Sequence, residues 1–367
     1  MADLARIGSL DGLRATAAVL IVAHHLGLAS FAASLTARGQ GAAGTFLSHF
    51  GASGVALFFT LSAVVLLRPY LQAGRPMEAG KYAWRRATRL WPPFFGAWLF
   101  AGFVVLLLSS MPTWWPSAMP AFSVSTWLSQ AFVVYIGRAP YNFAWWTLTI
   151  EVVFYALAPL VVFILYRRSI TMTWLLFALT VGVSLVAGVF EPAGGTTIGA
   201  MRLLSFASCF AGGLVLAKQA LGAATRAGLA GLGLIVIAVS SFSVQLNSHV
   251  GYGLLYMAIV AQAMERESRI ATWLSRPLMI WLGERSYSLF LTHYSVIALS
   301  CWSTSWMIGG KTAAFFVITR LLAVIGSLAA ACLLFELVES RFAHGLVSVG
   351  QWWPGKCSMA SGPTART

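Results

Sequence analysis

The stretch IGSLDGLRATAAVLIVAHHLGLASF, residues 7–31, is apolar enough to cross a bilayer, yet it contains Asp11, Arg14 and His25. An α-helix turns about 100° and rises about 1.5 Å per residue, so Arg14 and His25 share one face, roughly 16 Å apart along the axis. Asp11 falls within about 40° of His25 in the same projection. Ionisable groups are costly in lipid and are usually functional there. We therefore expect this polar stripe to face protein or water.

The composition of the chain is that of a polytopic membrane protein. Among its 367 residues, 59% are hydrophobic and only 9% are charged, and there are 15 Trp and 24 Phe. These values lie outside the range of soluble globular domains. The first apolar segment carries ionisable residues at its centre and no small-residue cleavage site follows it, which favours a retained helix over a signal peptide.

The apolar runs predict an all-α fold of about ten transmembrane helices around a polar intramembrane cavity, since about 20 apolar residues span a bilayer. These runs fall near residues 8–30, 46–68, 92–110, 145–166, 173–190, 198–217, 228–246, 250–264, 278–300 and 313–337. We assign residues 1–345 to one transmembrane domain. Residues 346–367 are predicted to form a disordered cytoplasmic tail.

The distribution of Lys and Arg predicts the orientation. The second, fourth, sixth and eighth connections between the predicted spans are basic, whereas the odd-numbered ones are poor in Lys and Arg. The basic residues are Arg68, Arg75, Lys81, Arg85, Arg86, Arg89, Arg167, Arg168, Lys218, Arg226, Arg266, Arg269 and Arg276. The positive-inside rule then places both termini and the even connections in the cytoplasm. The net charge of +14 follows from this asymmetry, so it does not indicate a nucleic-acid partner.

The connection WRRATRLWPP, residues 84–93, carries the clearest candidate for binding a phosphorylated ligand. Arg86 and Arg89 lie one helical turn apart, and guanidinium groups grip phosphate through a fork of donors that Lys lacks. The alternative is a basic cluster at the membrane edge that sets topology and contacts anionic lipid. Pro92 and Pro93 are expected to begin the next span, because Pro is tolerated in a first helical turn.

Glu151, in FAWWTLTIEVVFYALAPL, is an acidic residue in an apolar run with no cation nearby in the sequence. It must be protonated, face water, or have a partner on another helix. Arg14, Arg202 and Arg320 are the candidate partners. A catalytic role and a structural bridge between helices both fit this position.

His293 and Tyr287 lie in LGERSYSLFLTHYSVIAL among several hydroxyl side chains. They are candidates for binding substrate, although a hydrogen-bonded residue of helix packing is the commoner role of such a His. Ser62 is expected to bond a backbone carbonyl rather than act as a nucleophile. No structural disulfide and no metal site are predicted, since the cysteines are scattered without metal-ligand spacing, at Cys209, Cys301, Cys332 and Cys357.

Taken in order, five blocks resemble acyltransferase family 3, the integral membrane O-acyltransferases that modify bacterial polysaccharides, lipopolysaccharide, nodulation factors and some antibiotics. The blocks are SLDGLRATAAVLIVAHH (9–25), GVALFFTLSAVVL (54–66), WRRATRLWPPF (84–94), WWTLTIEVVFY (145–155) and LGERSYSLFLTH (282–293). Each motif alone is weak, but the ordered set is specific. The resemblance covers most of the chain.

The resemblance implies a multi-pass protein of the bacterial inner membrane that takes an acyl group from cytoplasmic acyl-CoA, usually acetyl-CoA. It implies a saccharide or glycolipid acceptor with a free hydroxyl and no permanently bound cofactor. The family's functional positions fall on Arg14, His25, Arg86, Arg89, Glu151 and His293.

The residues and the resemblance together predict a mechanism. Arg86 and Arg89 would hold CoA phosphates, and neutral His25 would act as general base on the acceptor hydroxyl. Asp11 or Arg14 would set the orientation and tautomer of His25. In an alternative mechanism His25 itself is transiently acylated. Two other classes of function are a transporter or flippase for a lipid-linked saccharide and a non-catalytic membrane partner.

Overall fold

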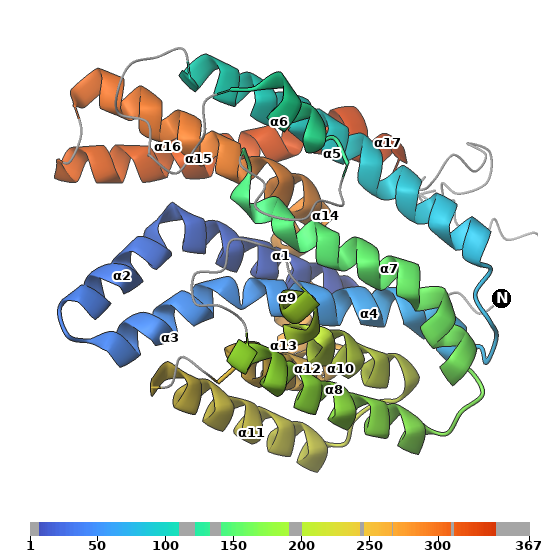
Figure 1. Ribbon diagram of the computed structural model, residues 1–367. Coiled ribbons are helices and arrows are strands. Elements are labelled where there is room, and N and C mark those ends of the chain that lie inside the picture. Colours follow the sequence, from blue (N-terminus) through green and yellow to red (C-terminus); the bar gives the residue numbers. More distant parts are fainter. Residues whose placement is uncertain are drawn as a thin grey trace, which may run out of the picture.

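The computed structural model describes residues 7–109, 122–132, 141–190, 200–242, 246–265, 267–309 and 312–342, and these residues form helices without any strand (Figure 1). This confirms the predicted all-α fold. The predicted tail, residues 346–367, lies outside the described residues.

Figure 1 labels the α-helices of the described residues in chain order. Their bounds are α1 Gly8–Ala23, η1 His24–Leu28, α2 Ala29–Ala37, α3 Gly41–Ala52, α4 Gly54–Gln72, α5 Ala79–Ser109, α6 Val124–Ser129, η2 Phe143–Trp145, α7 Trp146–Leu165, α8 Ile170–Phe190, α9 Ala200–Ser205, α10 Ala207–Lys218, α11 Ala223–Phe242, α12 Ser248–Ala263, α13 Arg269–Leu274, α14 Pro277–Glu284, α15 Ser286–Ile308, α16 Ala313–Leu334, η3 Phe335–Glu339 and α17 Ser340–Phe342.

Eight helical segments within the described residues are long and apolar enough to cross a membrane. They correspond to eight of the predicted runs. The run at 250–264 corresponds to α12, which has only 16 residues. The run at 278–300 falls on two helices, α14 and the first part of α15, which is rich in hydroxyl side chains. The chain is therefore a polytopic membrane protein, with eight candidate spans among the described residues where about ten were predicted.

The helix α1 is largely buried and packs against α4, α13, α14 and α15. Glycines make the closest of these contacts possible. A Cβ at Gly12 would lie 2.1 Å from the carbonyl oxygen of Leu274, and a Cβ at Gly283 would lie 2.0 Å from that of Asp11. Small residues allow such backbone contact between membrane helices. The polar start of α1 is thereby held inside the bundle.

Two expectations about the spans were wrong. The first span is not one straight α-helix, because α1 ends at Ala23 and the chain passes through the π-helical turn η1, where Gly27 has φ 141°. The third span begins before Pro92, since α5 runs from Ala79 through both Pro92 and Pro93. The hydroxyl of Tyr287 in α15 donates to the carbonyl oxygen of Leu90 at 3.1 Å, next to these prolines. The basic cluster is thus part of the spanning helix.

Candidate active site

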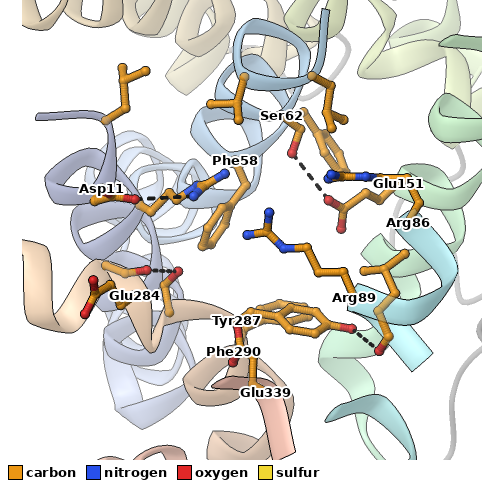
Figure 2. Close-up of a pocket in the computed structure, with 18 of the residues that line it drawn as sticks. Asp11, Phe58, Ser62, Arg86, Arg89, Glu151, Glu284, Tyr287, Phe290 and Glu339 are labelled. Atoms are coloured by element: carbon orange, nitrogen blue, oxygen red, sulfur yellow. Dashed lines mark hydrogen bonds and ion pairs between the residues drawn. The ribbon is translucent and has the colours of Figure 1, made fainter. Parts of the chain in front are cut away.

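A cavity of about 1020 Å³ lies between α1, α4, α5, α7, α14, α15 and η3 (Figure 2). Its wall is unusually polar for a membrane protein, where charged side chains are rare and mark functional positions. The ionisable residues that line it are Asp11, Arg14, Arg68, Arg86, Arg89, Glu151, Tyr155, Glu284, Tyr287, Glu336 and Glu339. Most of the residues singled out from the sequence therefore meet in one place.

Asp11 and Arg14 form an ion pair across one turn of α1, with 3.4 Å between Asp11 Oδ1 and Arg14 Nη1. The spacing places both side chains on the same helix face, and both line the cavity. Asp11 is only 4% exposed. The charge of Arg14 is thus largely balanced by its own helix.

Two further acidic residues of the wall pair with Arg285, at the junction of α14 and α15. Arg285 Nη2 lies 2.6 Å from Glu336 Oε1, and Arg285 Nη1 lies 3.7 Å from Glu284 Oε2. Arg285 therefore offsets one of the two negative charges of these carboxylates.

Three arginines of the cavity wall have no carboxylate in contact among the described residues. Among the described residues Arg89 has no hydrogen bond or ion pair, and Figure 2 shows its side chain extending into the middle of the cavity. The buried Nε atoms of Arg86 and Arg68 also have no hydrogen-bond partner within the described part of the chain. Buried donors without partners are uncommon in proteins and call for an explanation such as an absent anionic ligand.

Glu151 of α7 faces these arginines and takes hydrogen bonds from two hydroxyls. Ser62 Oγ of α4 donates to Glu151 Oε1 at 3.3 Å, and the hydroxyl of Tyr155, one turn further along α7, donates to the same oxygen. The backbone acceptor expected for Ser62 was wrong, because a carboxylate from another helix lies within reach.

Of the three arginines expected as candidate partners of Glu151, only Arg14 lines the same cavity. Arg202 lies over the ring of Trp146, 4.8 Å from its centroid, and Arg320 lies over the ring of Phe316, 5.5 Å from its centroid. Arg202 and Arg320 are therefore held by aromatic rings outside the cavity wall.

Glu339 is a site residue that the sequence reasoning missed. It lies in η3 at the end of the last span, is 4% exposed, and accepts a hydrogen bond from Ser288 Oγ of α15 at 2.5 Å. The available signal was the pair of acidic residues in FELVE, which directly follows a long apolar run. Arg68 was considered only for topology, and the burial of its Nε gives it a place in the site.

Tyr287 places its ring in the cavity wall while its hydroxyl is bonded to α5 (Figure 2). The ring face is therefore the part of this residue that a ligand can contact.

His25 and His293 lie beyond the cavity wall and contact each other. His25 Nδ1 is 2.9 Å from His293 Nε2, and the two rings stack with 5.1 Å between their centroids. One turn before each His, Ile21 and Phe290 line the cavity. The ring of Phe290 contacts both Phe58 of the cavity wall and His293. The histidine pair is therefore one side-chain layer away from the cavity.

The contacts of His25 differ from those expected. Asp11 and Arg14 were expected to orient its ring, but Asp11 bonds Arg14 and the ring nitrogen of His25 faces His293 instead. The π-helical turn explains part of this difference, since α-helical geometry ends at Ala23.

Comparison with known proteins adds independent evidence. A family model described as an acyltransferase domain matches residues 7–336. Acyltransferase MdmB from Streptomyces mycarofaciens is 26% identical over 321 residues, which cover 80% of this chain and 79% of that protein. No solved structure matches the chain. The family match runs from the start of α1 into η3 and so includes nearly all of the cavity wall.

Proposed function

The chain belongs to the acyltransferase domain family, and from this premise we propose that it is a membrane O-acyltransferase that uses acyl-CoA, acetyl-CoA by family default. The acceptor is a hydroxyl of a cell-envelope saccharide or of a related glycan or lipo-oligosaccharide. The observation that carries the proposal is the set of guanidinium groups without carboxylate partners, those of Arg68, Arg86 and Arg89.

These arginines suit the phosphates of a CoA donor. Arg binds phosphate through paired, charge-assisted hydrogen bonds, which are roughly twice as strong as neutral ones. The cavity volume of about 1020 Å³ lies at the upper end of the usual range for small-molecule sites, which suits a large nucleotide thioester. We therefore assign the phosphate end of the donor to this cavity.

The position of the cavity in the bundle supports entry from the cytoplasm. Its wall includes Ile7 before α1, Arg68 near the end of α4 and Arg86 near the start of α5, and these helix ends lie on the same side (Figure 1). The positive-inside rule places this side in the cytoplasm. We accordingly propose a location in the bacterial inner membrane with both termini cytoplasmic.

His25 is the proposed general base. Its ring nitrogen removes the proton from the acceptor hydroxyl as the oxygen attacks the thioester carbonyl. The tetrahedral intermediate collapses with cleavage of the C–S bond, and the CoA thiolate takes the proton back from His25. The pantetheine arm would have to pass the layer of Phe58 and Phe290 to bring the thioester to His25. In the alternative mechanism the acyl group resides briefly on His25.

The donor half of the proposal is tested by binding of radiolabelled acetyl-CoA to the purified protein in detergent. We expect Arg86→Gln with Arg89→Gln to weaken binding by at least about 10-fold, since a hydrogen bond to a charged group contributes about 1.5–3 kcal/mol. Arg85→Gln is the matched control, because Arg85 directly precedes Arg86, is exposed and does not line the cavity. Equal binding by all three proteins would refute the phosphate site.

The catalytic half is tested with His25→Ala. We expect this variant to bind acetyl-CoA normally and to transfer no acyl group, whereas retained transfer would exclude His25 as the base. The acceptor is identified by mass spectrometry of surface glycans from a deletion strain, searched for the loss of one acyl group. Unchanged glycans would count against an envelope saccharide.

A further inference from the structure

We propose that His293 is a positioning residue that fixes the tautomer of His25, so that Nε2 of His25 is the nitrogen free to act as the base. This inference rests on the proposed function of His25 and adds a specific role for a second histidine. It follows from the directions of a chain of hydrogen bonds that begins at the backbone of α15.

The first link determines which nitrogen of His293 carries its proton. His293 Nδ1 lies 2.8 Å from the carbonyl oxygen of Phe290 and 3.2 Å from that of Leu289. A carbonyl oxygen only accepts, so Nδ1 must be the protonated nitrogen. A neutral imidazole carries one proton, and Nε2 of His293 is therefore an acceptor. His293 is 0% exposed, and a buried ring bonded only to neutral groups is most stable in the neutral state.

The second link transfers this choice to His25. Because His293 Nε2 is an acceptor, His25 Nδ1 at 2.9 Å must be the donor. In neutral His25 the proton then resides on Nδ1, and Nε2 has a free lone pair. When His25 takes the acceptor's proton on Nε2, Nδ1 keeps donating to His293, and the proton on Nε2 later passes to the CoA thiolate.

The surroundings hold the ring of His25 in place. The ring stacks on His293, and the edges of His24 and Tyr294 meet it with centroid distances of 5.3 and 5.6 Å. His25 is partly exposed, whereas His293 is fully buried. His25 is thus the member of the pair that an acceptor can reach, and His293 acts through it.

The carbonyl of Phe290 connects this arrangement to the donor cavity. The same residue accepts the hydrogen bond from His293 and contributes its ring to the cavity wall. The layer that the thioester must pass therefore belongs to the same helical turn that orients the base.

The test compares His293→Leu with His293→Gln in membrane vesicles that contain the native acceptor and receive radiolabelled acetyl-CoA. The Gln side chain reaches the former Nε2 position with an oxygen that accepts from His25 Nδ1, whereas Leu has no acceptor. We expect His293→Leu to lower kcat by about 100-fold or more with an unchanged KM for acetyl-CoA, as for loss of a correctly oriented base. His293→Gln should stay within about 10-fold of the wild type. His249→Gln is the control for loss of a histidine elsewhere, since His249 stacks on Phe206.

The outcomes separate this inference from the proposed function. If His25→Ala abolishes transfer but His293→Leu keeps at least a third of the wild-type kcat, the role of His293 is wrong and that of His25 stands. If His25→Ala is active, the proposed function itself fails. If both His293 variants bind acetyl-CoA normally but are equally inactive, the hydrogen-bond role is refuted.

A measurement on the unmodified protein covers the case in which His293→Leu does not fold. In protein labelled with ¹⁵N-histidine, nitrogen chemical shifts distinguish protonated from unprotonated ring nitrogens. We expect His25 to be protonated on Nδ1 and unprotonated on Nε2, with the assignment made by comparison with His25→Ala. The opposite tautomer on His25 would overturn the proposal.

Discussion

The guanidinium of Arg320 lies directly against the backbone of Gly27, across the interface between α16 and the π-helical turn η1. A Cβ at position 27 would lie 2.6 Å from Arg320 Nη2, and Gly27 has φ 141°. The positive φ strains any residue that has a side chain, and Arg320 would have to move to make room for a Cβ. Because His25 belongs to the same turn, the contact couples the geometry of the proposed base to a distant helix.

We expect Gly27→Ala to lower the free energy of unfolding by about 1–3 kcal/mol, the usual cost of a strained backbone conformation, with a further cost from the clash with Arg320. Acyl transfer should also fall, since the turn that carries His25 must shift. The measurements are denaturant unfolding of the purified protein and transfer of labelled acetyl groups in vesicles.

The control for this prediction is Gly39→Ala. Gly39 has φ 81°, but nothing lies within 4 Å of its Cβ position, so the variant tests backbone strain without a clash. Adding Arg320→Ala to Gly27→Ala should recover part of the lost stability. If Gly27→Ala lowers the free energy of unfolding no more than Gly39→Ala does, the contact with Arg320 does not contribute to stability.

Arg68 is predicted to be a third phosphate ligand. Its buried Nε has no hydrogen-bond partner within the described residues, and its side chain lines the same cavity as Arg86 and Arg89. We expect Arg68→Gln to raise the KM for acetyl-CoA by about 10-fold or more with little change in kcat, as for loss of uniform binding. Arg75→Gln is the control, because Arg75 is exposed and outside the cavity wall. Equal KM values for the two variants would show that Arg68 does not bind the donor and acts only in setting the membrane topology.

Substitution of Glu339 should change the KM for acetyl-CoA in the opposite direction to substitution of Arg68. Its carboxylate lines the arginine-rich cavity, so it competes with donor phosphates for positive charge. Glu339→Gln removes the charge and keeps an acceptor for Ser288 Oγ. We expect the KM for acetyl-CoA to fall by about 2- to 10-fold, which corresponds to about 0.4–1.4 kcal/mol. A rise in KM would show that Glu339 supports donor binding instead.

Ser62 is predicted not to be a nucleophile. Its Oγ donates to Glu151 Oε1, and the Tyr155 hydroxyl donates to the same oxygen. Ser62→Ala should therefore keep most of the transfer activity and lower the free energy of unfolding by about 0.6–1.7 kcal/mol, the range for hydrogen bonds between membrane helices. Ser34→Ala is the control, since Ser34 bonds a backbone carbonyl of its own exposed turn. Complete loss of transfer by a folded Ser62→Ala would restore the nucleophile hypothesis.

The parts of the site that follow from helix geometry could be predicted from the sequence. Asp11 with Arg14, and Arg86 with Arg89, lie one turn apart in α-helices, and a spacing of one turn fixes a shared face whatever the rest of the chain does. The positions of the apolar runs could also be predicted, because the length and polarity of a membrane span depend on the bilayer rather than on neighbouring helices.

The contacts between distant segments could not be predicted in this way. The partner of His25 is 268 residues away, and that of Glu151 in α4 is 89 residues away. Such pairs depend on how the helices pack, which no local spacing encodes. The π-helical turn at Gly27 could not be predicted from the local sequence either.

Tyr287 allows the hydroxyl and the ring of one side chain to be tested separately. The Tyr287 hydroxyl of α15 donates to the carbonyl oxygen of Leu90 in α5 at 3.1 Å, so it joins two helices. We expect Tyr287→Phe to lower the free energy of unfolding by about 0.6–1.7 kcal/mol while acetyl-CoA binding stays unchanged, because the ring remains in the cavity wall.

Tyr287→Ala should weaken acetyl-CoA binding as well, since it removes the ring that the ligand contacts. Tyr166→Phe is the control for loss of a phenolic hydroxyl, because Tyr166 lies at the end of α7 and its ring contacts Arg167. If Tyr287→Phe weakens acetyl-CoA binding as much as Tyr287→Ala does, the hydroxyl must contact the ligand, and its bond to α5 would have to break when the donor binds.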